Sequence, residues 1–363
     1  MPRASSTSSS RLHDGIRLLL KAAALALAAG LSMLALLVGL PDGNDFAGAT
    51  LDKHARLQAQ DGPKVVFVGG SNLAFGLDSA AVEQALGVPV VNMGMNAWLG
   101  LRFMLNEVRG ALRPGDTVVV ALEYEAWFLP GAFDGVEGAG PDQLMLLKVR
   151  PASSAYLGST TQVLGVARAI PYAAQQKTLR LLEAGLDRLQ GQSPVLSLIE
   201  RVETRGGFNR HGDLVSHLGV AWPHPLEPGV DLSRKQPNPR VLDLLREFHR
   251  DMAAQGVTVL VVPPPAPESY YQQHRAAIDA LFAHLRQGGP AGVPDAGRYA
   301  FPIARFFDNF NHLDAEGRAL RTRQVIRDIG PLMPDAARLT ASARTARAPG
   351  APDVVASAHA GAP

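Results

Sequence analysis

The sequence Lys64-Val65-Val66-Phe67-Val68-Gly69-Gly70-Ser71-Asn72 decides the fold. Its apolar run is short and ends on two glycines, which is typical of a strand buried on both faces of a parallel sheet. Two further runs of the same kind follow, from Val88 to Asn92 and from Thr117 to Leu122. Helical spacing of apolar residues separates these runs. Strands that alternate with helices predict an α/β fold with a mostly parallel sheet covered on both sides.

The same pattern resumes after an interruption. The stretch from about residue 131 to residue 239 is rich in Gly, Pro and polar residues apart from a helical leucine stripe, so it predicts a helical and loop insertion within one domain. A fourth strand is expected from Val257 to Val262. Helices are expected from Asp78 to Leu86, Trp98 to Val108, Val241 to Met252, Ile278 to Leu285 and Asp314 to Ile329, with Asp78 and Asp314 as N-caps. The α/β domain therefore covers residues 60–333, and the composition of residues 334–363 predicts a disordered tail.

The N-terminus predicts a membrane anchor. Residues 22–40 carry no charge, and about 20 apolar residues cross the hydrocarbon core as a helix. Residues 1–21 hold four basic residues against one acidic residue, which favours a cytoplasmic N-terminal tail and an exported C-terminal body. A cleaved signal peptide is the alternative, with Ala47-Gly48-Ala49 as its cleavage site. The length of the apolar run favours the anchor.

Composition excludes several classes of function. Outside the N-terminal tail the chain has no excess of basic charge, so nucleic acid is not an expected partner. The absence of cysteine removes disulfide scaffolds, thiolate zinc sites and cysteine nucleophiles. The spacing of His211, His217 and His224 matches no zinc motif, so we expect no metal and interpret these as surface or loop histidines.

Two known motifs fail at Gly69-Gly70-Ser71. A dinucleotide-binding loop needs glycines that Ser71 and the residues after it do not supply, and a nucleophile elbow needs Gly where Leu73 stands. Two interpretations remain. Ser71 is a nucleophile at the end of a strand, or the tripeptide is a tight turn that requires small residues.

A histidine near the C-terminus favours the nucleophile. A serine needs a base that is itself oriented by a third group, and His312 follows Asp308 by four residues, just before the last predicted helix. Ligands of open α/β sheets bind beyond the carboxyl ends of the strands, where Ser71 also lies. We therefore expect Ser71 and His312 to meet at one edge of the sheet.

These motifs resemble those of the SGNH (GDSL-type) hydrolase superfamily: Gly70-Ser71-Asn72 after the first strand, Gly94 after the second, and an Asp–His pair before the C-terminal helix. With the anchor, the chain is similar to SGNH-like acyltransferases of the cell envelope, such as the alginate O-acetylation proteins and the D-alanyl transfer protein of teichoic acids. The resemblance covers about residues 64–329 and implies a three-layer α/β/α sandwich.

The resemblance also implies roles for individual residues. Ser71 would be the nucleophile, His312 the base and Asp308 its orienting partner, with the N–H groups of Ser71 and Gly94 as the oxyanion hole. The family's acid stands three residues before the histidine, where this chain has Asn309, so Asn309 is the alternative orienting residue.

The family's asparagine after the third strand is absent. This chain has Glu123 and Glu125 there. They either face the substrate or pair with basic neighbours, and pairing is the favoured interpretation. Asn96 or Asn72 could supply the missing side-chain donor.

Two hypotheses follow for function. The first is an exported, membrane-anchored serine esterase or O-acyltransferase that acts on an envelope polysaccharide or related polymer. It needs no cofactor, and its partners would be the membrane, a glycan substrate and a membrane-bound acyl donor protein. The second is a non-catalytic protein of the same fold that binds a glycan or an envelope partner through a degenerate site.

Overall fold

Four parallel strands form the sheet that positions the site. They are β1 (Val65–Gly69), β2 (Val90–Asn92), β3 (Thr117–Ala121) and β4 (Thr258–Val261), in the spatial order β2-β1-β3-β4. The register pairs Gly69 with Ala121. All residues of β1 and β3 are buried, which confirms the prediction from their continuous apolar character. This computed structural model describes residues 7–39, 46–60, 62–131, 140–191, 197–288, 290 and 292–333.

Most of the remaining elements are helices. The α-helices after the first strand are α3 (Ser71–Gly76), α4 (Ser79–Leu86), α5 (Leu101–Arg109), α6 (Tyr124–Phe128), α7 (Pro141–Val149), α8 (Thr160–Leu189), α9 (Leu198–Val202), α10 (Pro239–Ala254), α11 (Glu268–Gly288) and α12 (Ala315–Ile329). Short 3-10 turns are η2 (Ala97–Leu99), η4 (Pro151–Tyr156), η5 (Arg205–Gly207), η6 (Ala296–Tyr299), η7 (Ile303–Arg305) and η8 (Gly330–Leu332). A two-stranded sheet pairs β5 (Ala266–Pro267) with β6 (Ala300–Phe301).

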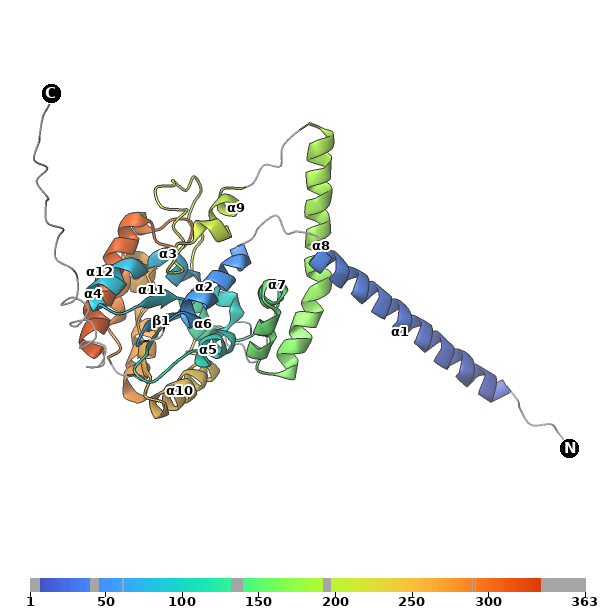
Figure 1. Ribbon diagram of the computed structural model, residues 1–363, viewed down its shortest axis with the longest axis horizontal. Helices are drawn as coiled ribbons and strands as arrows, with labels where there is room; N and C mark the ends of the chain where they lie inside the picture. The colour runs from blue at the N-terminus through green and yellow to red at the C-terminus, as the bar shows by residue number, and fades with distance from the viewer. Residues whose placement is uncertain are drawn as a thin grey trace, which may run out of the picture.

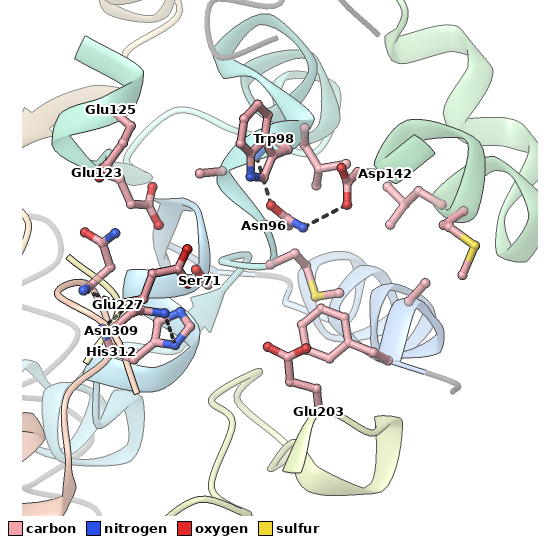
Figure 2. Close-up of a pocket in the computed structure, with 18 of the residues that line it drawn as sticks. Ser71, Asn96, Trp98, Glu123, Glu125, Asp142, Glu203, Glu227, Asn309 and His312 are labelled. Carbon is pink, nitrogen blue, oxygen red and sulfur yellow. Dashed lines mark hydrogen bonds between the residues drawn. The ribbon is translucent and has the colours of Figure 1, made fainter. Parts of the chain in front are cut away.

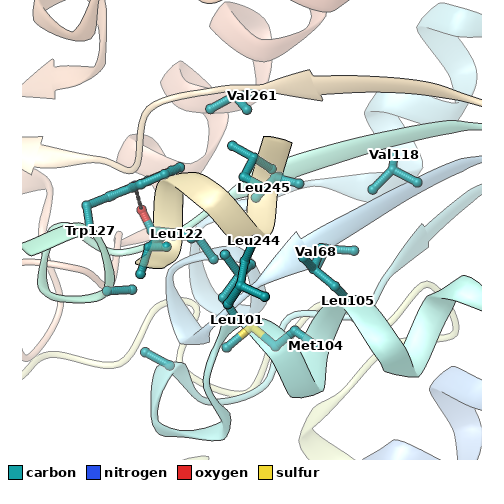
Figure 3. Packing of buried hydrophobic residues seen from close by; sticks show 14 of the residues in the cluster. Val68, Leu101, Met104, Leu105, Val118, Leu122, Trp127, Leu244, Leu245 and Val261 are labelled. Atoms are coloured by element: carbon teal, nitrogen blue, oxygen red, sulfur yellow. Dashed lines mark hydrogen bonds between the residues drawn. The ribbon is translucent and has the colours of Figure 1, made fainter. Parts of the chain in front are cut away.

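Alternate residues of the strands pack into two different cores. One core contains Val66, Val68, Val118 and Val120 with apolar residues of α5, α10 and α11 (Figure 3). The other contains their neighbours in the strands with residues of α4 and α12. Helices therefore cover both faces of the sheet, as the alternation of strands and helices predicts.

The local signals at the helix ends are confirmed. The Asp78 carboxylate accepts a hydrogen bond from the Ala81 N–H and caps α4, and Gly87, with φ of 68°, follows the last residue of this helix. Asp314 caps α12 by accepting the Gly317 N–H at 2.7 Å. Helices α4 and α12 thus begin at the residues expected from the sequence, whereas α5, α10 and α11 begin at Leu101, Pro239 and Glu268 rather than at Trp98, Val241 and Ile278.

The structure describes most of residues 131–239, the segment predicted as an insertion. It contains α7, α8, α9 and a long segment without α-helix between η5 and α10. The 30-residue α8 packs against α7 at one end and extends beyond the body of the domain (Figure 1). Residues 132–139 lie outside the described residues, as does the predicted tail at 334–363.

The N-terminal helix is longer than expected. Helix α1 runs from Thr7 to Gly39, and its stretch from His13 to Gly39 is long and apolar enough to cross a membrane. It leaves the domain beside α8 (Figure 1). The sequence pattern missed α2 (Ala49–Gln58), which follows the 3-10 turn η1 (Phe46–Gly48) and includes the end of the alternative cleavage site.

Candidate active site

Ser71 is the first residue of α3, directly after β1. Glycines are required here because the end of β3 and the 95–97 segment approach closely. A Cβ on Gly69 would overlap the Ala121 carbonyl oxygen. A Cβ on Gly70 would overlap the Glu123 carboxylate and stand 2.6 Å from the Ala97 nitrogen. The turn therefore needs small residues and also carries Ser71 into a cavity.

The cavity has a volume of about 600 Å³ and lies beyond the carboxyl ends of the strands. Segments far apart in the chain line it, among them those that carry Ser71, Asn96, Glu123 and His312. Figure 2 shows Ser71, Glu123, Glu227 and His312 on one side of the view, with Asn96 and Asp142 on the other. The structure thus brings Ser71 and His312 into one cavity, as expected from their positions in the sequence.

Two neighbours fix the His312 ring. Its Nδ1 lies 2.7 Å from Asp308 Oδ1, and its face stacks on Phe75 with ring centroids 3.7 Å apart and an interplanar angle of 1°. Phe75 stands four residues after Ser71 on α3, so one short helix carries the serine and the ring that supports the histidine. The side chain of His312 is 7% exposed and lines the cavity.

Asn309 touches the same nitrogen. Its Nδ2 lies 2.9 Å from His312 Nδ1, while its Oδ1 accepts the N–H groups of Asn311 and His312 at 2.8 and 3.1 Å. Those two bonds fix the orientation of the amide, so its NH2 group faces His312 Nδ1. Asn309 therefore favours the tautomer with the lone pair on Nδ1, whereas Asp308 favours the tautomer with the proton on Nδ1. We assign the proton to Nδ1, because a carboxylate against a nitrogen lone pair would be repulsive and the Asp308 contact is the shorter. Nε2 then carries the lone pair that can accept a proton.

No hydrogen bond joins the Ser71 hydroxyl to His312 within the described part of the chain. Catalytic hydrogen bonds are often long before substrate binds. The geometric support for a Ser71–His312 pair is therefore that both residues line the same cavity.

Gly94 is not placed to serve in an oxyanion hole, contrary to the expectation. Its N–H donates to Asn92 Oδ1 at 2.9 Å, its carbonyl accepts from Lys53, and it does not line the cavity. Asn92 is the last residue of β2, and its side-chain oxygen accepts the Gly94 N–H two residues further on. Two other N–H groups, those of Ser71 and Ala97, have no acceptor among the described residues. Ala97 lines the cavity beside Gly70.

The two asparagines offered as side-chain donors differ in position, and only Asn96 lines the cavity, where its amide uses one of its two N–H groups for Asp142. The Asn96 Nδ2 donates to Asp142 at 2.9 Å, and its Oδ1 accepts the Trp98 N–H. Asn72 is fully buried, donates to the Ala121 carbonyl and accepts from Arg321. Both asparagines therefore hold the walls of the site in place.

Glu123 differs from the expectation of pairing with a basic neighbour. It is 2% exposed and lines the cavity, and no ion pair to it is found among the described residues. Its Oε1 accepts the Asn72 N–H at 2.9 Å, and its Oε2 is buried without a partner in that same part of the chain. Glu123 thus lies beside the turn that carries Ser71.

Other acidic residues make the cavity wall predominantly acidic. Burial raises the pKa of Glu125, of Asp142 and of Glu203, because it penalises the charged form of each. Glu125 also faces the charge of Glu123, which acts in the same direction. Arg180 of α8 is the basic residue that lines the cavity with them.

Residues Phe208 to Asp213 form a polar loop in the segment between η5 and α10, and none of them lines the cavity. The buried Asp213 accepts from Ser79, Asn92 and Arg318, and Lys53 donates to the carbonyl of Gly212, so the loop is bound to the end of β2. Burial lowers the pKa of Lys53 to about 7.

The three histidines lie on the surface or in loops, as expected. His224 is exposed, whereas His211 and His217 are buried. Among the described residues no group of three His, Asp or Glu side chains is arranged to hold a metal ion.

Comparison with known proteins adds no assignment. No protein-family model matches this chain, and a search of curated proteins finds no significant match. Function is therefore argued from the site itself.

Proposed function

We propose that this chain is an exported, membrane-anchored serine esterase or O-acyltransferase of the SGNH-like type. Its substrates would be ester-linked acyl groups of an envelope polysaccharide or related polymer. The observation that carries the proposal is the arrangement of His312, whose Nδ1 contacts the Asp308 carboxylate while the ring lines the cavity that contains Ser71. A base held in this way beside a serine at a strand end is the arrangement that nucleophilic acyl transfer requires.

Each residue has a defined part in the first half-reaction. The Ser71 Oγ attacks the ester carbonyl carbon while its proton passes to His312 Nε2, and the Asp308 carboxylate stabilises the imidazolium. The N–H groups of Ser71 and Ala97 would donate to the oxyanion, in place of Gly94, at about 3 kcal/mol each. When the ester C–O bond breaks, the imidazolium returns its proton to the leaving alcohol and the acyl group stays on Ser71.

In the second half-reaction, water or a sugar hydroxyl loses its proton to His312 and attacks the acyl carbon. The acyl group leaves Ser71, which regains a proton from the imidazolium. Hydrolysis and transfer differ only in this acceptor. No metal or cofactor is needed for either.

Fold and location belong to the same proposal. Helices on both faces of a parallel sheet fit a three-layer α/β/α sandwich, and the order of the Ser, Gly and Asp–His segments fits the SGNH superfamily. The basic tail before α1 favours export of the domain. A membrane-bound acyl donor protein and a glycan acceptor would be the partners in transfer.

Covalent labelling tests the proposal directly. A fluorophosphonate probe added to the full-length protein in membranes is expected to label wild type, and Ser71→Ala and His312→Gln are expected to abolish labelling. Ser233→Ala and His224→Gln are matched controls, because both residues are exposed and outside the cavity lining, and labelling should be unchanged. Labelling that persists in Ser71→Ala would reject Ser71 as the nucleophile.

A second candidate function is non-catalytic binding of a glycan or envelope partner. It is favoured by the Glu123 carboxylate beside Ser71 and by the commitment of the Gly94 N–H to Asn92. If wild type takes no label and Ser71→Ala keeps full function in cells, the binding protein is the better interpretation.

A further inference from the structure

Helix α8 exposes a row of large apolar side chains. Tyr172, Leu179, Leu182 and Leu186 are between 46% and 59% exposed, and Leu189 is 85% exposed. At 3.6 residues per turn, these positions and Leu164 fall within an arc of about 100° on one side of the helix. Exposed apolar rows of this length mark surfaces that meet another apolar phase. We call this row the outer face of α8.

The opposite side of α8 packs on the end of α1. Val166, Ala169 and Ala174 are buried in one cluster with Leu37 of α1, with Met33 and Leu36 partly buried beside them. Lys177 of α8 donates to the Leu37 carbonyl oxygen at 3.0 Å, which supplies a partner for one of the last carbonyls of α1 and places a cation at that end of the helix. Helix α8 is thus held at the level of the last turns of α1.

The position of α8 beside the last turns of α1 determines the surroundings of its outer face. Met33, Leu36 and Leu37 belong to the stretch of α1 that can cross a membrane. If α1 spans the bilayer, any side chain at the level of these residues that no protein covers lies among lipid head groups and acyl chains. The outer face of α8 continues from that level, so lipid is its expected neighbour.

The charges of α8 agree with an interfacial position. The exposed basic residues of α8, Arg168, Arg180 and Arg188, outnumber Glu183 and Asp187, and excess basic charge favours a surface with anionic lipids. Most of the charged residues of its second half lie away from the arc of Leu182 and Leu186. This distribution is that of an amphipathic helix lying in the membrane surface.

We propose that the outer face of α8 inserts into the surface of the bilayer that α1 crosses, as a second attachment of the domain to the membrane. The proposal depends on α1 as a membrane span and does not depend on esterase activity. Arg180 projects from the same helix into the lining of the cavity. Attachment through α8 would therefore hold the cavity close to the lipid surface.

Cysteine labelling tests the proposal cleanly, because the natural chain contains no cysteine. Single variants Leu182→Cys and Leu186→Cys of the full-length protein are labelled with NBD and reconstituted in vesicles of phosphatidylcholine and phosphatidylglycerol. Arg188→Cys is the matched control on the same helix, exposed but outside the arc. Quenching by lipids that carry a nitroxide on the upper acyl chain is compared with quenching by aqueous iodide.

The two quenchers should give opposite patterns. We expect nitroxide lipids to quench NBD at Leu182 and Leu186 about twofold or more, with protection from iodide, and the reverse at Arg188. Equal iodide access at all three positions would overturn the proposal. Protection from both quenchers, together with disulfide cross-linking between copies at Leu186→Cys, would assign the face to a second copy of this chain instead. Thermal unfolding of each variant checks that the fold is retained.

Discussion

Asp308→Asn removes one charge at the nitrogen that orients the proposed base and changes almost nothing in volume. In the structure Asp308 Oδ1 lies 2.7 Å from His312 Nδ1, and its side chain is 11% exposed, so solvent screens the contact little. An amide at this place can donate to Nδ1 and stabilise the tautomer with its proton on Nε2. Asn309 Nδ2, already 2.9 Å from Nδ1, would favour the same tautomer.

The expected loss follows from that change of tautomer. With the proton on Nε2, His312 cannot accept the proton of Ser71, and no carboxylate stabilises the imidazolium. Loss of the acid in a Ser-His-Asp arrangement lowers the rate about 10³- to 10⁴-fold, or about 4 to 5.5 kcal/mol of transition-state stabilisation. The rate of fluorophosphonate labelling measures this loss in the full-length protein, and hydrolysis of a p-nitrophenyl ester provides a second readout.

Asn309→Ala is the control at the same nitrogen. It removes the acceptor of two backbone N–H groups, so we expect a fall of about 1 to 3 kcal/mol in the free energy of unfolding and less than about a tenfold change in labelling rate. The reverse result, with a large loss of rate in Asn309→Ala and little in Asp308→Asn, would refute the assignment of Asp308 and return the role to Asn309.

Three further outcomes follow from the packing around the site. In Gly70→Ala the new Cβ would overlap the Glu123 carboxylate and crowd the Ala97 nitrogen, so thermal unfolding should show a loss of about 1 to 3 kcal/mol and probe labelling should fall. Burial lowers the pKa of His217 to about 4, so between pH 6.5 and 4 the unfolded chain binds a proton that the native chain does not. Stability should fall by about 3 kcal/mol from this group as the pH drops through that window, and in His217→Gln the fall should be smaller by that amount. Lys53→Met leaves three buried carbonyl oxygens without their donor and should cost about 3 to 5 kcal/mol in chemical denaturation.

The features that could be predicted from the sequence are those that local patterns specify. A short continuous apolar run that ends on glycines, such as residues 65–69, is typical of a buried parallel strand, and Asp78 and Asp314 cap their helices through bonds three residues away. Helix α2 escaped notice because a buried lysine and histidine, Lys53 and His54, interrupt its apolar face. Those residues are paired with groups distant in the chain, which no local pattern reports.

The site was predictable only where strand ends determine it. Ser71 follows β1 and His312 precedes α12, so the topology alone brings both to one edge. The expectation that the Gly94 N–H belongs to an oxyanion hole was wrong because the Asn92 side chain accepts that N–H. A contact of this kind cannot be inferred from the spacing of residues in the sequence. Glu123 carried a usable signal: β1 and β3 are neighbours with Gly69 opposite Ala121, so the residues two positions further on, Ser71 and Glu123, must lie close together.

A carboxylate beside a developing oxyanion would oppose catalysis if its charge were uncompensated. Arg321 of α12 is fully buried behind it and donates to both the backbone carbonyl and the side-chain oxygen of Asn72, whose N–H in turn holds Glu123. Burial lowers the pKa of Arg321 to about 10, and the charge of Glu123 acts in the opposite direction. The buried cation and the buried carboxylate therefore each reduce the cost of placing the other in the interior. The positive charge of Arg321 thus acts against the negative charge next to Ser71, so Glu123 is compatible with the acyl transfer proposed for Ser71.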